Sequence, residues 1–392
     1  MRIVVVGASL AGLSTVEALR KHGFDGAITV VGDESLLPYD RPPLSKQVLS
    51  GSWQPERGML RTDEALEALD TDLLLGTAAV DVDATAKMVD LADGSRVPYD
   101  ALVIATGAKA RPLSGTPQLA GVQTLRTLDD AIALKHELDH GPRVVVIGGG
   151  FVGAEVAAEA RRRELDVTIV EMLPVPLSRG LGEQMGTVCA QLHTRHGTRV
   201  RCGRTVSGLD GTRRVERVRL DDESSLEADL VVVGVGAAPA VDWLRDSGIE
   251  LGDGVHLDAY CRASAAGVYA VGDVARWFHQ DYGCHLRLEH WTNAKEQAAV
   301  VARNILSPEA PVPYTPVPYV WSDQYGSRIQ IVGRSTGDAH VVNESADRNR
   351  VVALYRTDDR LVGAFAINAA RQLLGYRRLL AQGASWQDAL AA

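Results

Sequence analysis

The sequence has no apolar run long enough to cross a membrane. The longest apolar runs, residues 3–6 and 230–233, have the length of a buried strand, whereas a helical span of a bilayer needs about 20 apolar residues. The run after Met1-Arg2 ends at Gly7, which is too short for the core of a secretory signal peptide. We therefore expect a cytoplasmic protein that does not bind a membrane.

Cysteine is scarce and scattered. The four cysteines are Cys189, Cys202, Cys261 and Cys284, and the two nearest are 13 positions apart. Zinc ribbons, clustered iron–sulfur ligands and local redox dithiols all need cysteines a few residues apart. We therefore expect reduced thiols and no bound metal ion.

The chain also lacks an excess of basic residues. It has 41 Lys and Arg against 50 Asp and Glu, which gives a formal charge of −9. Proteins that bind nucleic acid duplexes carry a dense basic surface. A nucleic acid partner is therefore not expected.

One supersecondary unit occurs twice. Each copy consists of an apolar strand, a glycine-rich turn, a segment with helical spacing and a second strand. The copies span residues 2–31 and 143–170. Short β-branched strands that alternate with helices indicate an α/β fold with parallel sheets.

The first glycine loop covers residues 7–12. Gly7 allows a tight turn, and Gly12 allows close packing of helix on strand, so that free backbone N–H groups can bind a pyrophosphate. Ser9 replaces the usual middle glycine but is still small. Asp33 and Glu34 follow the second strand, where a dinucleotide site requires a carboxylate for the ribose.

The second loop has all three glycines, Gly148, Gly150 and Gly153, and its second strand ends in Glu171. A carboxylate at that position accepts hydrogen bonds from ribose hydroxyls and repels a 2′-phosphate, so we expect NAD rather than NADP. The residues expected to bind NAD are Gly148, Gly150, Phe151, Val152, Gly153, Glu155, Glu171 and Gly236.

Four motifs together resemble the pyridine nucleotide:disulfide oxidoreductase superfamily of flavoproteins. They are residues 7–12, 101–107 (ALVIATG), 148–153 and 268–273 (VYAVGD). The resemblance implies two Rossmann-like domains, with an NAD domain inserted in an FAD domain, and a small α+β C-terminal interface domain. The implied boundaries are 1–112 and 235–312 for FAD, 113–234 for NAD and 313–392 for the interface.

Further segments resemble one branch of that superfamily, the NADH-dependent ferredoxin, rubredoxin and putidaredoxin-type reductases that serve cytochromes P450 and ring-hydroxylating dioxygenases. These segments are residues 37–46 (LPYDRPPLSK), 125–130 (LRTLDD), 289–291 (EHW) and 320–325 (VWSDQY). No cysteine occurs before Cys189, whereas disulfide reductases and peroxidases need one early in the chain. The resemblance implies electron transfer from NADH through FAD to a ferredoxin.

The resemblance also assigns roles to residues. Lys46 is expected near flavin N5, paired with Glu155, and these two are the candidate catalytic residues. Asp33 is the first choice for the adenosine ribose of FAD and Glu34 the second, although aligning the two repeats places Gly32, and not Asp33, opposite Glu171. The residues expected to bind FAD are Gly7, Ser9, Ala11, Gly12, Asp33, Glu34, Arg41, Lys46, Val80, Arg126, Asp273 and Trp291.

Residues 313–392 reverse the acidic balance of the chain, with nine Arg against seven Asp and Glu. Because ferredoxins are commonly acidic, we expect docking near Arg371, Arg377 and Arg378.

Two alternatives share the cofactor motifs: an NADH oxidase or small-molecule reductase, and a flavoprotein similar to apoptosis-inducing factor that acts mainly by binding. The oligomeric state is expected to be monomer or homodimer.

Overall fold

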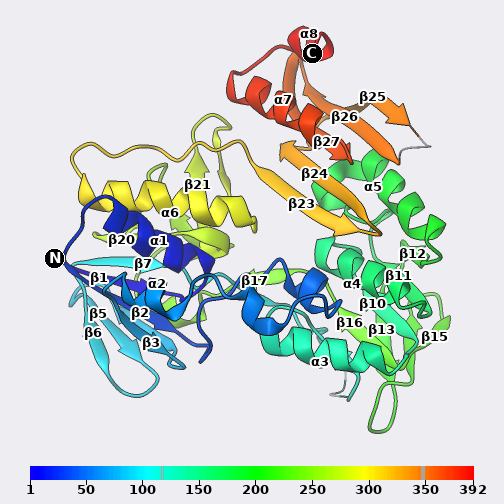
Figure 1. Cartoon of the computed structure of the whole chain (residues 1–392), viewed down its shortest axis with the longest axis horizontal. Coiled ribbons are helices and arrows are strands. Elements are labelled where there is room, and N and C mark those ends of the chain that lie inside the picture. The colour runs from blue at the N-terminus through cyan, green and yellow to red at the C-terminus, as the bar shows by residue number, and fades with distance from the viewer. Residues whose placement is uncertain (116, 118, 346–348) are drawn as a thin grey trace. The chain divides into compact units, whose positions relative to one another are not determined.

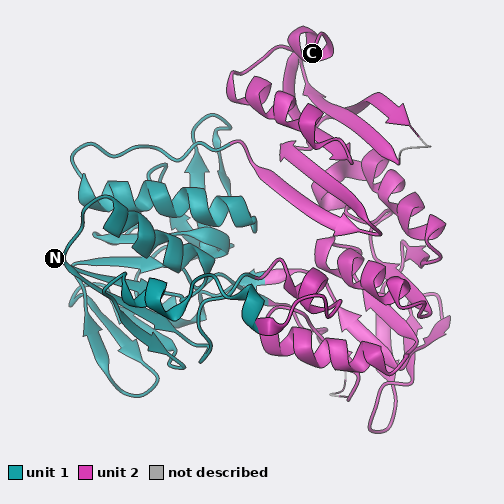
Figure 2. Cartoon of the chain, viewed as in Figure 1, with its two compact units in different colours: residues 1–40, 56–109, 238–316 teal, residues 41–55, 110–237, 317–392 magenta. Residues whose placement is uncertain are grey.

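The computed structural model describes residues 1–115, 117, 119–345 and 349–392 (Figure 1). The chain forms two compact units (Figure 2). Unit 1 contains residues 1–40, 56–109 and 238–316, and unit 2 contains residues 41–55, 110–237 and 317–392. Residues 41–55 therefore group with unit 2, although the expected FAD domain includes them. The division into three domains remains a prediction.

Unit 1 is built on a parallel five-stranded sheet. Its strands in spatial order are β20 (Val268–Ala270), β7 (Ala101–Ile104), β1 (Arg2–Val6), β2 (Ala27–Gly32) and β3 (Asp72–Leu75). These strands are rich in Val and Ile because a parallel sheet is covered on both faces. Helix α6 (Trp291–Leu306) packs along α1 (Leu10–Lys21), the helix that follows the first glycine loop (Figure 1).

Two smaller sheets complete unit 1. One contains β4 (Ala79–Asp83), β5 (Met88–Leu91) and β6 (Arg96–Pro98), and the other contains β18 (Leu251–Gly252), β19 (Gly254–Leu257), β21 (Ala275–His279) and β22 (Cys284–Leu286). Gly76 adopts a φ of +73° and ends β3, so that β4 enters a different sheet.

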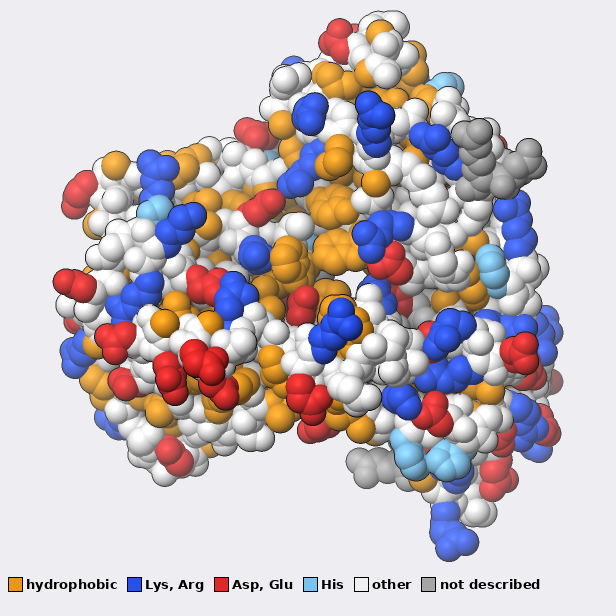
Figure 3. Space-filling model, viewed as in Figure 1, with side chains coloured by type: hydrophobic (Ala, Val, Ile, Leu, Met, Phe, Trp, Pro, Cys, Tyr) orange, Lys and Arg blue, Asp and Glu red, His pale blue; other side chains and the backbone are white. Residues whose placement is uncertain are grey.

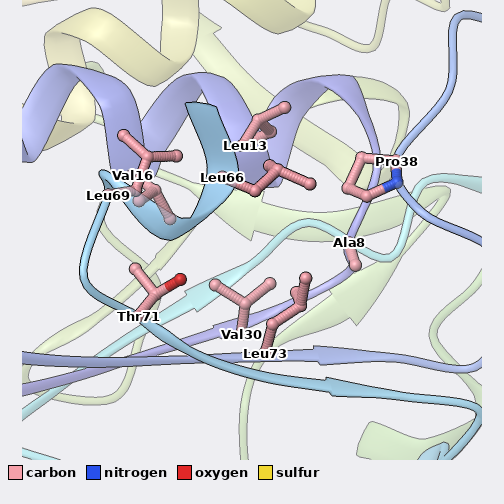
Figure 4. A pocket seen from close by; sticks show the side chains of 9 residues that line it. All are labelled: Ala8, Leu13, Val16, Val30, Pro38, Leu66, Leu69, Thr71 and Leu73. Carbon is pink, nitrogen blue, oxygen red and sulfur yellow. The ribbon is translucent and has the colours of Figure 1, made fainter. Parts of the chain in front are cut away.

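The short helix α2 (Asp63–Glu67) covers the sheet of unit 1 beside α1. Figure 4 shows Leu66 and the nearby Leu69 facing Leu13 and Val16 of α1, with Val30 of β2 below them. The residues that line this pocket are apolar except Thr71. This region is hydrophobic packing that holds α1 against the strands.

Unit 2 contains a second parallel sheet of five strands. In spatial order they are β12 (Arg199–Cys202), β11 (Val167–Glu171), β10 (Val144–Ile147), β16 (Leu230–Val233) and β9 (Val122–Gln123). Its helices are α3 (Leu128–Asp139), α4 (Phe151–Arg162) and α5 (Ser178–Arg195). The two parallel sheets and their helices confirm the predicted α/β class.

A small antiparallel sheet of β13 (Val206–Asp210), β14 (Arg217–Leu220) and β15 (Ser225–Glu227) lies next along the chain. Residues 226–233 are divided between this sheet and the parallel one. Leu226 pairs with β14 in antiparallel fashion, whereas Leu230 pairs with β10 in parallel fashion. The chain changes sheet at Asp229, whose carboxylate pairs with Arg143 at 2.8 Å.

The C-terminal part of unit 2 is an antiparallel sheet that carries two helices. The strands in spatial order are β23 (Tyr319–Gln324), β24 (Ser327–Gly333), β27 (Arg360–Ile367), β26 (Arg350–Thr357) and β25 (Asp338–Ser345). The helices are α7 (Ala370–Ala381) and α8 (Trp386–Leu390). This confirms the predicted α+β region, with β23 as an additional strand. Asp347 and Arg348, which entered the charge balance, lie outside the described residues.

His193 of α5 is buried against this C-terminal sheet. Its Nδ1 lies 2.7 Å from the Tyr325 hydroxyl, which also lies 2.7 Å from Thr198 Oγ1. Burial lowers the pKa of His193 to about 4 and raises the pKa of Tyr325 to about 12. Both groups are therefore neutral at pH 7.

Candidate functional site

The first glycine loop forms a cradle at the carboxyl edge of the sheet in unit 1. Gly7 has a φ of +121°, and its N–H donates to the Val31 carbonyl at 2.7 Å. A Cβ on Gly12 would lie 1.9 Å from the Gly7 carbonyl oxygen, so no side chain fits there. Ser9 precedes α1 without a side-chain capping bond, which leaves the first N–H groups of the helix to bind an anion.

Asp273 lies at the same edge, in a one-turn helix (Gly272–Val274) after β20. The N–H of Gly272 donates to Gln297 Oε1 of α6 at 2.8 Å, and a Cβ on Gly272 would lie 3.0 Å from that of Ala11. The turn that carries Asp273 therefore lies against the first glycine loop. Trp291, at the start of α6, donates from Nε1 to Asp40 Oδ1 at 2.8 Å.

The two carboxylates after β2 differ in environment. Asp33 is exposed, whereas Glu34 is partly buried and accepts a hydrogen bond from the Tyr39 hydroxyl. Both follow Gly32, the last residue of β2. The choice of Asp33 for the ribose remains a prediction, as does the role of Val80, which is half-exposed on β4.

The second glycine loop repeats this construction in unit 2. Gly148 has a φ of +100°, and its N–H donates to the Val170 carbonyl at 2.8 Å. A Cβ on Gly153 would lie 2.3 Å from the Gly148 carbonyl oxygen. Gly150 is the N-cap of α4, whose first two residues are Phe151 and the exposed Val152.

Beside this loop is a cavity of about 390 Å³, a size suited to a small-molecule ligand. Glu171 is buried at its wall. Its Oε2 accepts the Gly149 N–H at 2.7 Å, and its Oε1 accepts the Leu173 N–H at 2.8 Å. Five of the residues that we expect to bind NAD line this cavity: Gly148, Gly150, Phe151, Glu171 and Gly236.

Glu155 of α4 is the centre of a buried polar cluster in unit 2. Its Oε2 accepts from Lys46 Nζ at 2.8 Å and from Ser45 Oγ at 2.5 Å, and its Oε1 accepts from Ser322 Oγ at 2.6 Å. Gln324 Nε2 donates to Ser322 Oγ at 3.0 Å. The Lys46–Glu155 ion pair implied by the family is therefore present, and its role at a flavin remains a prediction.

Sequence reasoning did not identify Ser45, Ser322 or Gln324 as site residues. Ser45 and Lys46 lie in a short π-helical segment (Leu44–Val48), and Ser322 lies on β23. The signal available was that all three occur in the motif segments 37–46 and 320–325. Only the tertiary structure brings those segments to one carboxylate.

The arginines expected at FAD in unit 2 are neighbours. Arg41 Nη1 donates to the Arg126 carbonyl at 2.6 Å. Asp130 Oδ2 accepts the Arg126 N–H at 2.8 Å and the Thr127 N–H at 3.0 Å, and the Asp130 N–H donates to Thr127 Oγ1 at 3.1 Å, which completes a capping box at the start of α3. The family motif at residues 125–130 is thus a helix cap that holds the backbone of Arg126.

The three arginines expected to dock a partner lie on α7 but differ in exposure. Arg371 and Arg378 are exposed, whereas Arg377 is partly buried with its guanidinium 5.6 Å from the centre of the Tyr319 ring. Figure 3 shows basic side chains gathered over the region of α7. Leu374, on the same helix, is half-exposed.

The described residues hold no group of three or more His, Cys, Asp or Glu that could bind a metal ion. All four cysteines are free, and burial raises the pKa of Cys189 and Cys261 to about 12, so neither is a thiolate at neutral pH. In the part of the chain that was described, no helix is both long and apolar enough for a bilayer span.

Comparison with known proteins gives matches over nearly the whole chain. The family described as pyridine nucleotide-disulphide oxidoreductase matches residues 1–298, and that described as reductase C-terminal matches residues 319–392. The benzene 1,2-dioxygenase system ferredoxin–NAD(+) reductase subunit of Pseudomonas putida is 38% identical over 96% of this chain and 92% of its own length. Rhodocoxin reductase of Rhodococcus erythropolis is 36% identical over 97% of this chain and 90% of its own length.

The fold is also similar to solved structures. A covalent putidaredoxin reductase–putidaredoxin complex matches with a TM-score of 0.93 and 32% identity, over 97% of this chain and 93% of the matched one. The ferredoxin reductase for the CYP199A2 system of Rhodopseudomonas palustris matches with a TM-score of 0.94 and 32% identity, over 98% of this chain and 95% of the matched one.

Proposed function

The chain belongs to the pyridine nucleotide-disulphide oxidoreductase family, and on that premise we propose that it is a ferredoxin–NAD(+) reductase that uses FAD. It takes electrons from NADH and passes them to a ferredoxin that serves a dioxygenase or a cytochrome P450. Relatives at 34–38% identity over almost the full length carry such reductase names. The observation that carries the proposal is the pair of glycine-loop cradles, each at the carboxyl edge of a parallel sheet.

The residues of unit 1 fit FAD. The Gly7–Gly12 cradle, which a Cβ would fill, offers helix N–H groups to a pyrophosphate, and the turn that carries Asp273 lies against it. When bound, FAD accepts a hydride and releases electrons one at a time. The remaining FAD residues expected in unit 2 are Arg41, Lys46 and Arg126.

The chain's own residues bind and orient the nicotinamide nucleotide in unit 2. Glu171 keeps free lone pairs on both oxygens after accepting two backbone bonds, so it can also accept ribose hydroxyls. Its negative charge favours NADH over NADPH. Glu155 holds the ammonium group of Lys46 in place, and Ser45 and Ser322 orient the Glu155 carboxylate.

The ferredoxin docks near α7 in this proposal. Arg371 and Arg378 are exposed there, and an acidic partner would be attracted to them at long range. We place the protein in the cytoplasm, where its four free cysteines stay reduced. It acts as a monomer or homodimer.

The test is NADH-dependent reduction of cytochrome c with and without an added ferredoxin of a P450 system. The proposal expects a yellow protein with FAD and a rate that depends on ferredoxin. Direct NADH oxidation by oxygen or a quinone with no response to ferredoxin would indicate an oxidase or small-molecule reductase. Bound FAD with negligible turnover would indicate a binding flavoprotein.

A further inference from the structure

A charged pair lies beside Glu171 at the cavity of unit 2. Arg204 lines the cavity, and its backbone N–H donates to the Glu171 carbonyl at 3.2 Å. Its guanidinium Nε lies 2.8 Å from Asp222 Oδ2. Arg204 is therefore adjacent to the carboxylate expected to select the ribose, but its side chain is held by an acid.

Asp222 is fixed by its own turn between β14 and β15. Its Oδ1 accepts the Ser224 N–H at 3.1 Å and the Ser224 hydroxyl at 2.5 Å. The other oxygen remains for Arg204. The carboxylate is thus oriented locally, whereas the longer, partly exposed side chain of Arg204 has other rotamers open to it once Asp222 no longer holds it.

A second arginine, Arg179, also lines the cavity. Arg179 is exposed, and a Cβ on its neighbour Gly180 would lie 3.8 Å from the Phe151 ring. Phe151 begins α4, the end of the site expected to bind the pyrophosphate. Arg204 is the arginine whose backbone is bonded to Glu171.

We propose that Asp222 is a specificity-determining residue that holds Arg204 away from the 2′ position of the bound ribose. An arginine beside that position would bind a 2′-phosphate in charge-assisted contacts. With Arg204 held, its guanidinium is not available to a 2′-phosphate, which instead meets the negative charges of Glu171 and Asp222. The inference rests on the proposed use of NADH. It adds Asp222 to Glu171 as a residue that selects NADH over NADPH.

The test is Asp222→Asn, which removes the charge and keeps an oxygen for Ser224. We expect the ratio of kcat/KM for NADPH to that for NADH to rise about tenfold, the scale of one hydrogen bond to a charged group. The double variant Asp222→Asn with Arg204→Gln should lose this rise, because Arg204 supplies the new contact. A rise that persists in the double variant would overturn the inference, as would no rise in the single one.

The matched control is Asp210→Asn in the neighbouring strand β13. Asp210 Oδ1 lies 3.0 Å from Arg219 Nε, and both side chains are about as exposed as Asp222 and Arg204. This control should leave the nucleotide ratio unaltered. An equal rise in the control would mean that overall charge causes the effect, and this too would overturn the inference.

A binding measurement separates this inference from the proposed function. Calorimetric titration with adenosine 2′,5′-bisphosphate and with AMP needs no electron transfer. Asp222→Asn, or Asp222→Ser if the first variant folds poorly, should tighten the bisphosphate about tenfold relative to AMP. Unchanged relative affinity would refute the role of Asp222, whereas a protein inactive with every ferredoxin would refute only the proposed function.

Discussion

Breaking the buried ion pair between Lys46 and Glu155 should be costly. The Nζ–Oε2 distance is 2.8 Å, and the exposed fractions of the two side chains are 13% and 4%. Coulomb's law gives about 6 kcal/mol of attraction at that distance and an effective dielectric constant of 20. Desolvation of both ions offsets part of this, and removing one partner of such a pair costs about 3–5 kcal/mol. We therefore expect Glu155→Leu to lower the free energy of unfolding by about 3 kcal/mol or more.

The assay is urea unfolding of the flavin-loaded protein, followed by flavin fluorescence and circular dichroism. The double variant Lys46→Met with Glu155→Leu should recover much of the loss, because no buried charge remains unpaired. The control is Asp242→Asn, which breaks the exposed Arg245–Asp242 pair at 2.5 Å and should cost less than about 1 kcal/mol. If Glu155→Leu costs no more than the control, or the double variant is no better than the single, the reasoning is refuted.

Four further outcomes are expected. Gly12→Val should abolish flavin binding, because the valine side chain would overlap the Gly7 carbonyl. Chromatography of the cofactor released from the unaltered protein should show FAD, and FMN would contradict the assignment. Gly153→Val should raise KM for NADH at least tenfold for the same reason while FAD content stays normal, and loss of FAD as well would point to general unfolding. Burial lowers the pKa of His193 to about 4, so neutral His193 favours the folded state above pH 6.5 and this contribution is lost as the pH falls. Between pH 7 and pH 5 the free energy of unfolding should fall by about 2 kcal/mol for this reason. His193→Gln should therefore flatten the pH dependence of Tm. Arg371→Glu with Arg378→Glu should slow ferredoxin-dependent cytochrome c reduction, most at low ionic strength, and leave NADH:ferricyanide activity unchanged; equal loss in both assays would indicate damage to folding.

The sequence by itself determined the two cradles. A glycine loop is read from six neighbouring residues, and its geometry depends on contacts within one strand–turn–helix unit, such as that of Gly12 with the Gly7 carbonyl. The parallel sheets follow from short Val-rich strands that alternate with helical segments. The Lys46–Glu155 pair was reached only through the family resemblance, since 109 positions separate the two residues.

The tertiary structure alone decided how distant segments meet. Ser322, on β23, bonds to Glu155 across 167 positions of sequence. The Arg204–Asp222 pair exists because the turn after β14 lies beside the end of β12. Glycines and apolar patterns act over a few residues, so they can be read locally. Side-chain contacts of this kind depend on how whole sheets and helices pack, which no local pattern in the sequence specifies.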